Sequence, residues 1–188
     1  TYMAYQEGEN LTSFMEIKGW RIYGQPSYTI LPFVEVELLS VNGVKFRATD
    51  GFPETGFDGA KFTLLLTHNM KNTDYNWTAG IYGINVDSNG EVTLSVLIRS
   101  EVTITGKPKN GNDVVFKFKI KKWFTSLGAT SSNTWDIINT SCSYGQMPSS
   151  LELAQRPSGG VVPRKVGTLW GEYGNLKTYG NAFSGTDY

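Results

Sequence analysis

Cysteine and histidine, two residues that often carry out chemistry, occur only once each in the sequence. Cys142 has no second cysteine with which to form a disulfide within the chain, and His68 falls in a different predicted module. A multi-cysteine zinc site and a catalytic site built on several histidines are therefore excluded. His68 follows Thr67 at a predicted strand end, where a polar histidine is usually solvated.

The acidic segment Asp87-Ser-Asn-Gly-Glu91 places oxygens at alternate positions, as a calcium-binding loop does. It lacks the remaining ligands of an EF-hand, and its Asn-Gly pair is typical of a hairpin turn. The segment therefore predicts a turn rather than a metal site. No motif supports a pair of glycosidase carboxylates, so we predict no enzymatic activity, no metal and no cofactor.

Basic and aromatic residues near the end of the chain are the candidates for binding another molecule. The loop 156–165 combines three basic residues with two prolines, as expected of a recognition loop on a rigid scaffold. Aromatic side chains such as those that follow often anchor protein interfaces, although at helical spacing Trp170 and Tyr173 are more often core. The predicted ligand-binding residues are Arg156, Arg164, Lys165, Trp170 and Tyr179.

The segment 114–124, VVFKFKIKKWF, is the clearest strand in the sequence. Its apolar and basic residues alternate with a period of two, which indicates a half-buried strand. The basic row at 117, 119, 121 and 122 is either a binding strip or, more commonly, the solvated face of an edge strand. We expect this strand to run into the next module without a flexible linker, which would hold the two modules semi-rigidly.

Roughly seven short strands are predicted in the first two-thirds of the chain, separated by turn signals. Their spacing of ~8–14 residues is typical of a β-sandwich. The first predicted inward row is Val34, Val36 and Leu38, and Trp77 is the natural core aromatic of a later strand. The glycine-rich segment 50–59 is predicted to be a loop.

After the strand at 114–124, the apolar period becomes helical. Capping-box patterns predict helix starts at Asn133 and Ser149, and Cys142 lies on the apolar face of the first of these helices. A third short helix is predicted, although Gly171 and Gly174 each weaken it by about 1 kcal/mol. Its apolar face, at positions i, i+4 and i+7, consists of Leu169, Tyr173 and Leu176.

The composition favours an extracellular, β-rich protein. The 188 residues include 5 Trp, 10 Tyr, 10 Phe and 21 Gly. The 17 basic and 17 acidic residues balance, so neither nucleic acid nor an anionic membrane is an expected partner. No apolar run approaches the ~20 residues that span a membrane. We expect the chain to be a piece of a longer protein, because no signal peptide opens it.

Two sets of phrases resemble a known family. The first set, in Val41 to Lys122, includes VNGVKFRATDGFPETGFDGAKFTLLL, DYNW and VDSNGEVTL, and is similar to bacterial Ig-like domains of intimin and invasin-type adhesins. The second set, in Trp123 to Tyr188, includes WDIINTSC, GQMPSSLEL and GTLWGEYGNLKTYG, and resembles the first half of their C-type-lectin-like domain. The expected fold class is mainly β with a small α+β module. The expected domains are an N-terminal extension at 1–30, an Ig-like β-sandwich at 31–122 and an incomplete C-type-lectin-like domain at 123–188.

The resemblance implies a bacterial surface protein, an inverse autotransporter, whose N-terminal outer-membrane barrel is absent here. It implies a non-catalytic adhesin tip that binds a host cell-surface or secreted protein, with integrin and immunoglobulin among the options. A carbohydrate-binding lectin module and a structural spacer in the adhesin rod are the alternatives. The family also implies a disulfide from Cys142 to a cysteine near the end of the lectin-like domain, which this chain lacks. No calcium or sugar ligand is carried over, since those residues would lie beyond Tyr188.

Overall fold

The computed structural model describes residues 31–126, 145–154 and 163–183. The chain divides into two units, Thr1–Phe33 and Val34–Tyr188, and the second contains every helix and strand described below. The N-terminal extension predicted at 1–30, and the helix predicted after Asn133, lie outside the described residues. None of the described helices is long and apolar enough to cross a membrane.

Five strands form one antiparallel sheet in the order β2-β1-β4-β7-β6. A tight turn at Asn42 and Gly43, both at positive φ, joins β1 to β2, as the Asn-Gly pair predicts. Along β4, the residues Phe62, Leu64 and Leu66 are buried and alternate with more exposed ones, as in a strand that packs one face on the core. The strands are β1 (Val36–Val41), β2 (Val44–Arg47), β4 (Ala60–Leu66), β6 (Ile84–Val86) and β7 (Glu91–Leu94).

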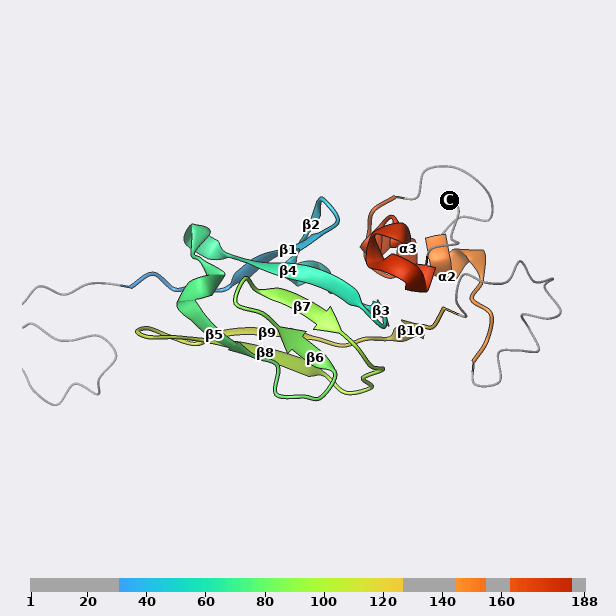
Figure 1. Cartoon of the computed structure of the whole chain (residues 1–188). Coiled ribbons are helices and arrows are strands. Elements are labelled where there is room, and N and C mark those ends of the chain that lie inside the picture. Colours follow the sequence, from blue (N-terminus) through green and yellow to red (C-terminus); the bar gives the residue numbers. More distant parts are fainter. Residues whose placement is uncertain (1–30, 127–144, 155–162, 184–188) are drawn as a thin grey trace, which may run out of the picture. The chain divides into compact units, whose positions relative to one another are not determined.

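A second antiparallel sheet of three strands packs against the first (Figure 1). Phe62 from the first sheet meets Phe116 and Phe118 of the second, with ring centroids 6.4 and 5.7 Å apart. Trp77 is 7% exposed and lies over Gly106 of the neighbouring strand, where a Cβ would be 2.7 Å from the ring. These contacts confirm the predicted β-sandwich and its core tryptophan. The strands are β5 (Tyr75–Thr78), β8 (Val102–Pro108) and β9 (Val114–Phe118).

A short parallel pair closes one end of the sandwich. Its strands are β3 (Thr55–Phe57) and β10 (Lys122–Phe124). The backbone N–H groups of Lys121 and Lys122 both donate to the carbonyl of Glu54, at 2.7 and 3.1 Å. The chain therefore leaves β9 and pairs again after three residues, so no flexible linker separates β9 from β10.

Three local predictions differ from the structure. The expected strand at 114–124 is two strands, because Lys119, Ile120 and Lys121 bend the chain away from β8 toward β3. The predicted loop at 50–59 contains β3. In β1, a register shift against β4 between Val36 and Leu38 changes which residues face inward.

Among the described residues after the sandwich, two short helices and a 3-10 segment occur. They are α2 (Ser150–Ala154), α3 (Leu169–Tyr173) and η4 (Leu176–Phe183). The capping box predicted at Ser149 is present, since Glu152 accepts from its backbone N–H and the Ser149 hydroxyl accepts from the Glu152 N–H. The third helix is confirmed as α3, although Leu176 begins η4.

Candidate functional site: the junction of the sandwich and the C-terminal segment

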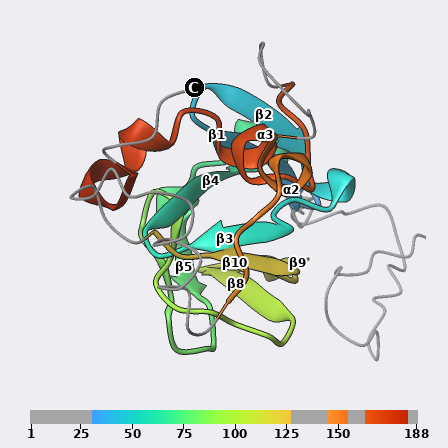
Figure 2. The same cartoon turned by 90° about the vertical axis from the view of Figure 1, so that its right-hand side faces the viewer.

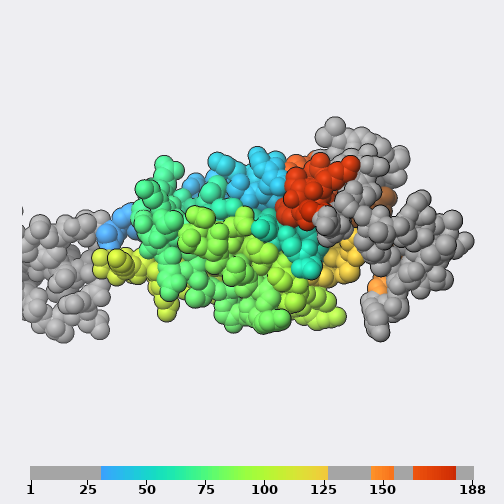
Figure 3. Space-filling view, in the orientation of Figure 1, coloured from blue at the N-terminus to red at the C-terminus, as the bar shows by residue number. Residues whose placement is uncertain are grey.

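The C-terminal segment, residues 163–180, packs directly on the sandwich. Leu169, Tyr173 and Leu176 are at most 2% exposed and belong to the same apolar core as the strands. The Tyr173 ring lies against Phe57 at 4.9 Å and Phe52 at 5.8 Å. Figures 2 and 3 show this segment, in red, against the end of the sandwich. The helical spacing therefore marked a core face, which was the favoured interpretation for Tyr173.

Glu172 joins this segment to β3 through a fully buried carboxylate. Its Oε1 accepts hydrogen bonds from the backbone N–H groups of Glu54 and Gly167, each at 2.9 Å. Its Oε2 accepts from the N–H of Thr55 at 2.9 Å and from the Thr55 hydroxyl at 2.6 Å. Four donors thus occupy the carboxylate, as the burial of a charge requires.

Burial raises the pKa of Glu172, and the four hydrogen bonds oppose that shift. The side chain comes from a helix of only five residues, whose Thr168 caps it by accepting from the Gly171 N–H at 3.2 Å. The apolar periodicity of the sequence does not point to Glu172, because its partners are backbone groups of a distant segment, and backbone groups leave no residue pattern. Only the fold brings residue 172 to residues 54 and 55.

Arg164, one of the predicted ligand-binding residues, donates to backbone carbonyls on both sides of the junction. Its Nη2 reaches Val41 at 2.8 Å and Glu172 at 3.0 Å, and its Nε reaches Gly171 at 3.2 Å. A Cβ on Gly174, which has φ 67°, would lie 2.5 Å from the guanidinium. Glycine at 174 therefore leaves room for the arginine, and as the C-cap it lies just beyond the end of α3.

The β1–β2 turn also binds the C-terminal segment. Asn42 Nδ2 donates to the Tyr173 carbonyl at 2.7 Å and to the Thr178 hydroxyl at 2.9 Å. The Tyr173 hydroxyl in turn donates to the Thr55 carbonyl at 2.8 Å. Hydrogen bonds from a side chain of the sandwich and from a side chain of the C-terminal segment therefore fix the segment, in addition to the apolar contacts.

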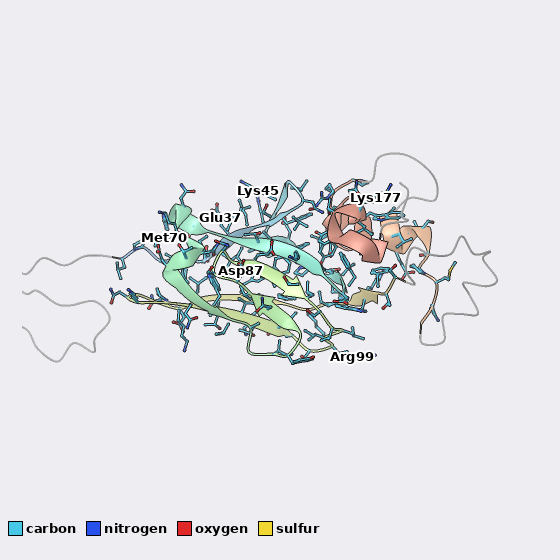
Figure 4. All side chains as sticks on the ribbon, viewed as in Figure 1. Glu37, Lys45, Met70, Asp87, Arg99 and Lys177 are labelled. Carbon is cyan, nitrogen blue, oxygen red and sulfur yellow. The ribbon has the colours of Figure 1, made fainter. Side chains whose placement is uncertain are left out.

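The other predicted binding residues differ in their surroundings. Lys165 is exposed, Trp170 is half-buried against the core, and Tyr179 is half-buried with its ring 5.0 Å from Phe57. Arg156 lies outside the described residues, as does Cys142 with its proposed disulfide. Ligand binding by these residues stays a prediction. In Figure 4, the exposed Lys177 of the same segment lies on the same side of the sandwich as Lys45.

The segment at Asp87 forms the predicted turn. Asp87 Oδ1 accepts from the backbone N–H groups of Asn89 and Glu91, at 2.9 and 2.8 Å. His68 is exposed at positive φ. Within residues 31–126, 145–154 and 163–183, no three His, Cys, Asp or Glu side chains gather as metal ligands would.

The row of lysines on and after β9 is exposed, and β9 is an edge strand of its sheet. Lys117 pairs with Glu101, Lys121 with Glu54 and Lys122 with Glu152. These pairs favour the solvated-face interpretation of the row over a binding strip.

Comparison with known proteins agrees with this architecture. Residues 36–120 match the family model of invasin domain 4. An invasin of Yersinia enterocolitica is 32% identical over 164 residues, which is 84% of this chain and 19% of the invasin. The chain thus spans about a fifth of that relative's length.

The solved structure of an invasin gives the same result. The crystal structure of an invasin, described as a bacterial integrin-binding protein, has a TM-score of 0.69 and 27% identity, covering 81% of this chain and 32% of that one. A fragment of intimin crystallised with its translocated receptor is more distant, with a TM-score of 0.48 and 18% identity over 61% of this chain and 41% of that one. By its match to invasin domain 4 and its 32% identity to an invasin, the chain belongs to the intimin and invasin-type adhesins, as part of their passenger region.

Proposed function

We propose that this chain is the binding tip of a bacterial surface adhesin and attaches the cell to a host surface or secreted protein without catalysis. The junction is the observation that carries this proposal. The buried Glu172 carboxylate and the Arg164 guanidinium fix the C-terminal segment on the sandwich, so its loops are presented on a rigid support. A preorganised surface loses less conformational entropy when a partner binds.

The family supports a protein partner and leaves its identity open. The crystallised invasin is described as integrin-binding, and an integrin is accordingly the first candidate here, with immunoglobulin as the second. Lys165, exposed on the C-terminal segment, and Arg156 are the proposed contact residues. We propose that the intact protein is anchored in the outer membrane and exposes this region outside the cell.

The test is retention of host cells, purified integrins and immunoglobulin on the immobilised chain. We expect Lys165→Glu to weaken retention by about tenfold, because a rim charge of this kind contributes roughly 1 kcal/mol or more when reversed. Lys119→Glu, an exposed lysine after β9, is the matched control and should bind as the wild type does. If both variants retain the host proteins equally well, the C-terminal segment is not part of the binding surface.

A further inference from the structure

A polar groove lies on the outer face of the five-stranded sheet, beside the C-terminal segment. Its volume is ≈ 470 Å³, within the range of roughly 300–1,000 Å³ typical of small-ligand sites. Ser40 on β1, Lys61 and Thr63 on β4 and Glu91 on β7 line its floor, and Thr178 and Tyr179 line its wall.

The wall is held in place by contacts to the sandwich. The Tyr179 hydroxyl donates to the Lys61 carbonyl at 3.3 Å, and Thr178 accepts from Asn42 at 2.9 Å. The Tyr179 ring also packs edge-on against Phe57 and Tyr173, at 5.0 and 5.8 Å. The groove therefore exists only because the C-terminal segment is docked, and its shape is largely fixed before any ligand binds.

The charges in the groove cancel. Lys61 Nζ lies 3.0 Å from Glu91 Oε1, and the two side chains are 50% and 41% exposed. An exposed pair of this kind contributes little to stability and can exchange its partners. With a net charge of zero, the groove attracts neither polyanions nor cations.

The position of the floor excludes a peptide that adds a strand. The floor strands β1, β4 and β7 are interior strands of the sheet, and each is hydrogen-bonded on both sides. A peptide that binds by strand addition needs an unpaired sheet edge. The ligand must instead be recognised by side chains, which here are hydroxyls, one ammonium, one carboxylate, the amide of Asn42 and the aromatic rings of Phe62 and Tyr179.

We propose that this groove binds a neutral saccharide of one or two rings. Adjacent sugar hydroxyls both donate and accept, so one can donate to the Glu91 carboxylate while its neighbour accepts from the Lys61 ammonium. The hydroxyls of Ser40 and Thr63 add further partners, and Tyr179 offers an apolar surface to the C–H face of the ring. This inference does not rest on the proposed host-protein contact, which uses other residues.

The test is an NMR titration of the whole chain with a panel of neutral mono- and disaccharides of hexoses and N-acetylhexosamines, to about 10 mM. We expect at least one sugar to shift the amide signals of Ser40, Thr63 and Thr178 in a saturable way. The double variant Lys61→Ala, Glu91→Ala should bind at least tenfold more weakly, because two charge-assisted hydrogen bonds are lost.

The matched control is Lys117→Ala, Glu101→Ala, which removes a similarly exposed ion pair from the other sheet and should leave sugar affinity unchanged. Melting temperatures of both variants establish that each is folded. The proposal is overturned if no sugar shifts the groove amides, or if the folded Lys61/Glu91 variant binds as the wild type does. The retention test depends on Lys165 and not on a sugar, so deglycosylated host receptors should give the same result in it. The two proposals can therefore fail separately.

Discussion

The buried carboxylate of Glu172 accepts four hydrogen bonds from protein groups. Three backbone N–H groups and one hydroxyl occupy positions that water would take around an exposed glutamate. Two of the N–H groups belong to Glu54 and Thr55, at the start of β3. One side chain thus satisfies backbone donors that would otherwise be buried without a partner when the C-terminal segment covers them.

We expect Glu172→Gln to lower the free energy of unfolding by about 2–3 kcal/mol. Each carboxylate oxygen of Glu172 accepts two hydrogen bonds, so in glutamine either orientation of the amide points its NH₂ group at two of these donors. Donors that are buried without an acceptor cost roughly 1–3 kcal/mol each. Urea unfolding measures the change. Glu101→Gln, at an exposed residue just before β8, should change stability by less than about 0.5 kcal/mol. Equal effects of the two substitutions would contradict the central role of Glu172.

Arg164 depends on the shape of its guanidinium as well as on its charge. We expect Arg164→Lys to lower the free energy of unfolding by about 1–2 kcal/mol, because one ammonium cannot reach the carbonyls of Val41, Glu172 and Gly171 together. The exposed Arg99→Lys is the control for the same chemical change. Thermal melting of both variants at one pH distinguishes them, and a stable Arg164→Lys protein would show that the positive charge alone suffices.

At the scale of elements, most strands follow from the alternation of apolar residues, as β4 and β8 show. The sequence could not reveal the bulge in β1, because the apolar alternation of Val36 and Leu38 continues through the point where the register against β4 shifts. Beyond that point the buried residues are Leu39 and Val41, and Leu38 is half-buried. The sequence also could not reveal β3, since Thr55-Gly-Phe57 has no periodic pattern and pairs with β10, whose residues come 67 positions later in the chain. Pairings between distant residues leave no local signal.

The C-terminal helix shows the same limit at its glycines. Gly171 and Gly174 weaken the helix prediction, yet both are required by packing. A Cβ at Gly171 would lie 2.4 Å from the Thr168 hydroxyl oxygen, and one at Gly174 would meet Arg164. Helix propensity describes an isolated segment. Glycine is needed at these two positions because the fold brings other atoms too close for a Cβ.

The capping box of α2 should titrate with pH. Hydrogen bonds from Ser149 hold the pKa of Glu152 below its ordinary value of 4.5, so the unfolded chain binds this proton more tightly than the folded one. The box therefore stabilises α2 fully above the unfolded value and is lost as the pH falls through the lower folded value. NMR titration of the Glu152 side chain should give a midpoint below 4.5, and Ser149→Ala should raise it. A midpoint at or above 4.5 in the wild type would mean that the box is open in solution.

At the scale of the whole molecule, the Ig-like sandwich and the C-terminal segment share one core. Tyr173, Leu169 and Leu176 complete an apolar cluster that includes Phe52 and Phe57 of the sandwich. The domain boundary predicted at 122/123 stays a prediction, but the side chains on either side of it are packed as within a single domain.

A chain that ends at Ser126 should therefore be less stable than the whole chain. It exposes Phe52 and Phe57 and loses the burial of three large apolar side chains, each worth about 1.5–3 kcal/mol. We expect the free energy of unfolding to fall by roughly 5 kcal/mol and the dye ANS to bind the truncated protein. Unchanged stability after this truncation would show that the two parts fold independently.

The contacts around Glu54 also have a mechanical consequence. Its N–H binds Glu172, its carbonyl binds the N–H groups of Lys121 and Lys122, and its side chain pairs with Lys121. If the molecule is pulled between β1 and the C-terminal segment, several hydrogen bonds at the start of β3 share the load. The force is therefore not carried only by the covalent chain that follows β10. A cell tethered in flowing liquid pulls on its attachment point in this way. Stretching single molecules should accordingly give one rupture for the sandwich and the segment together, and a separate low-force rupture in Glu172→Gln.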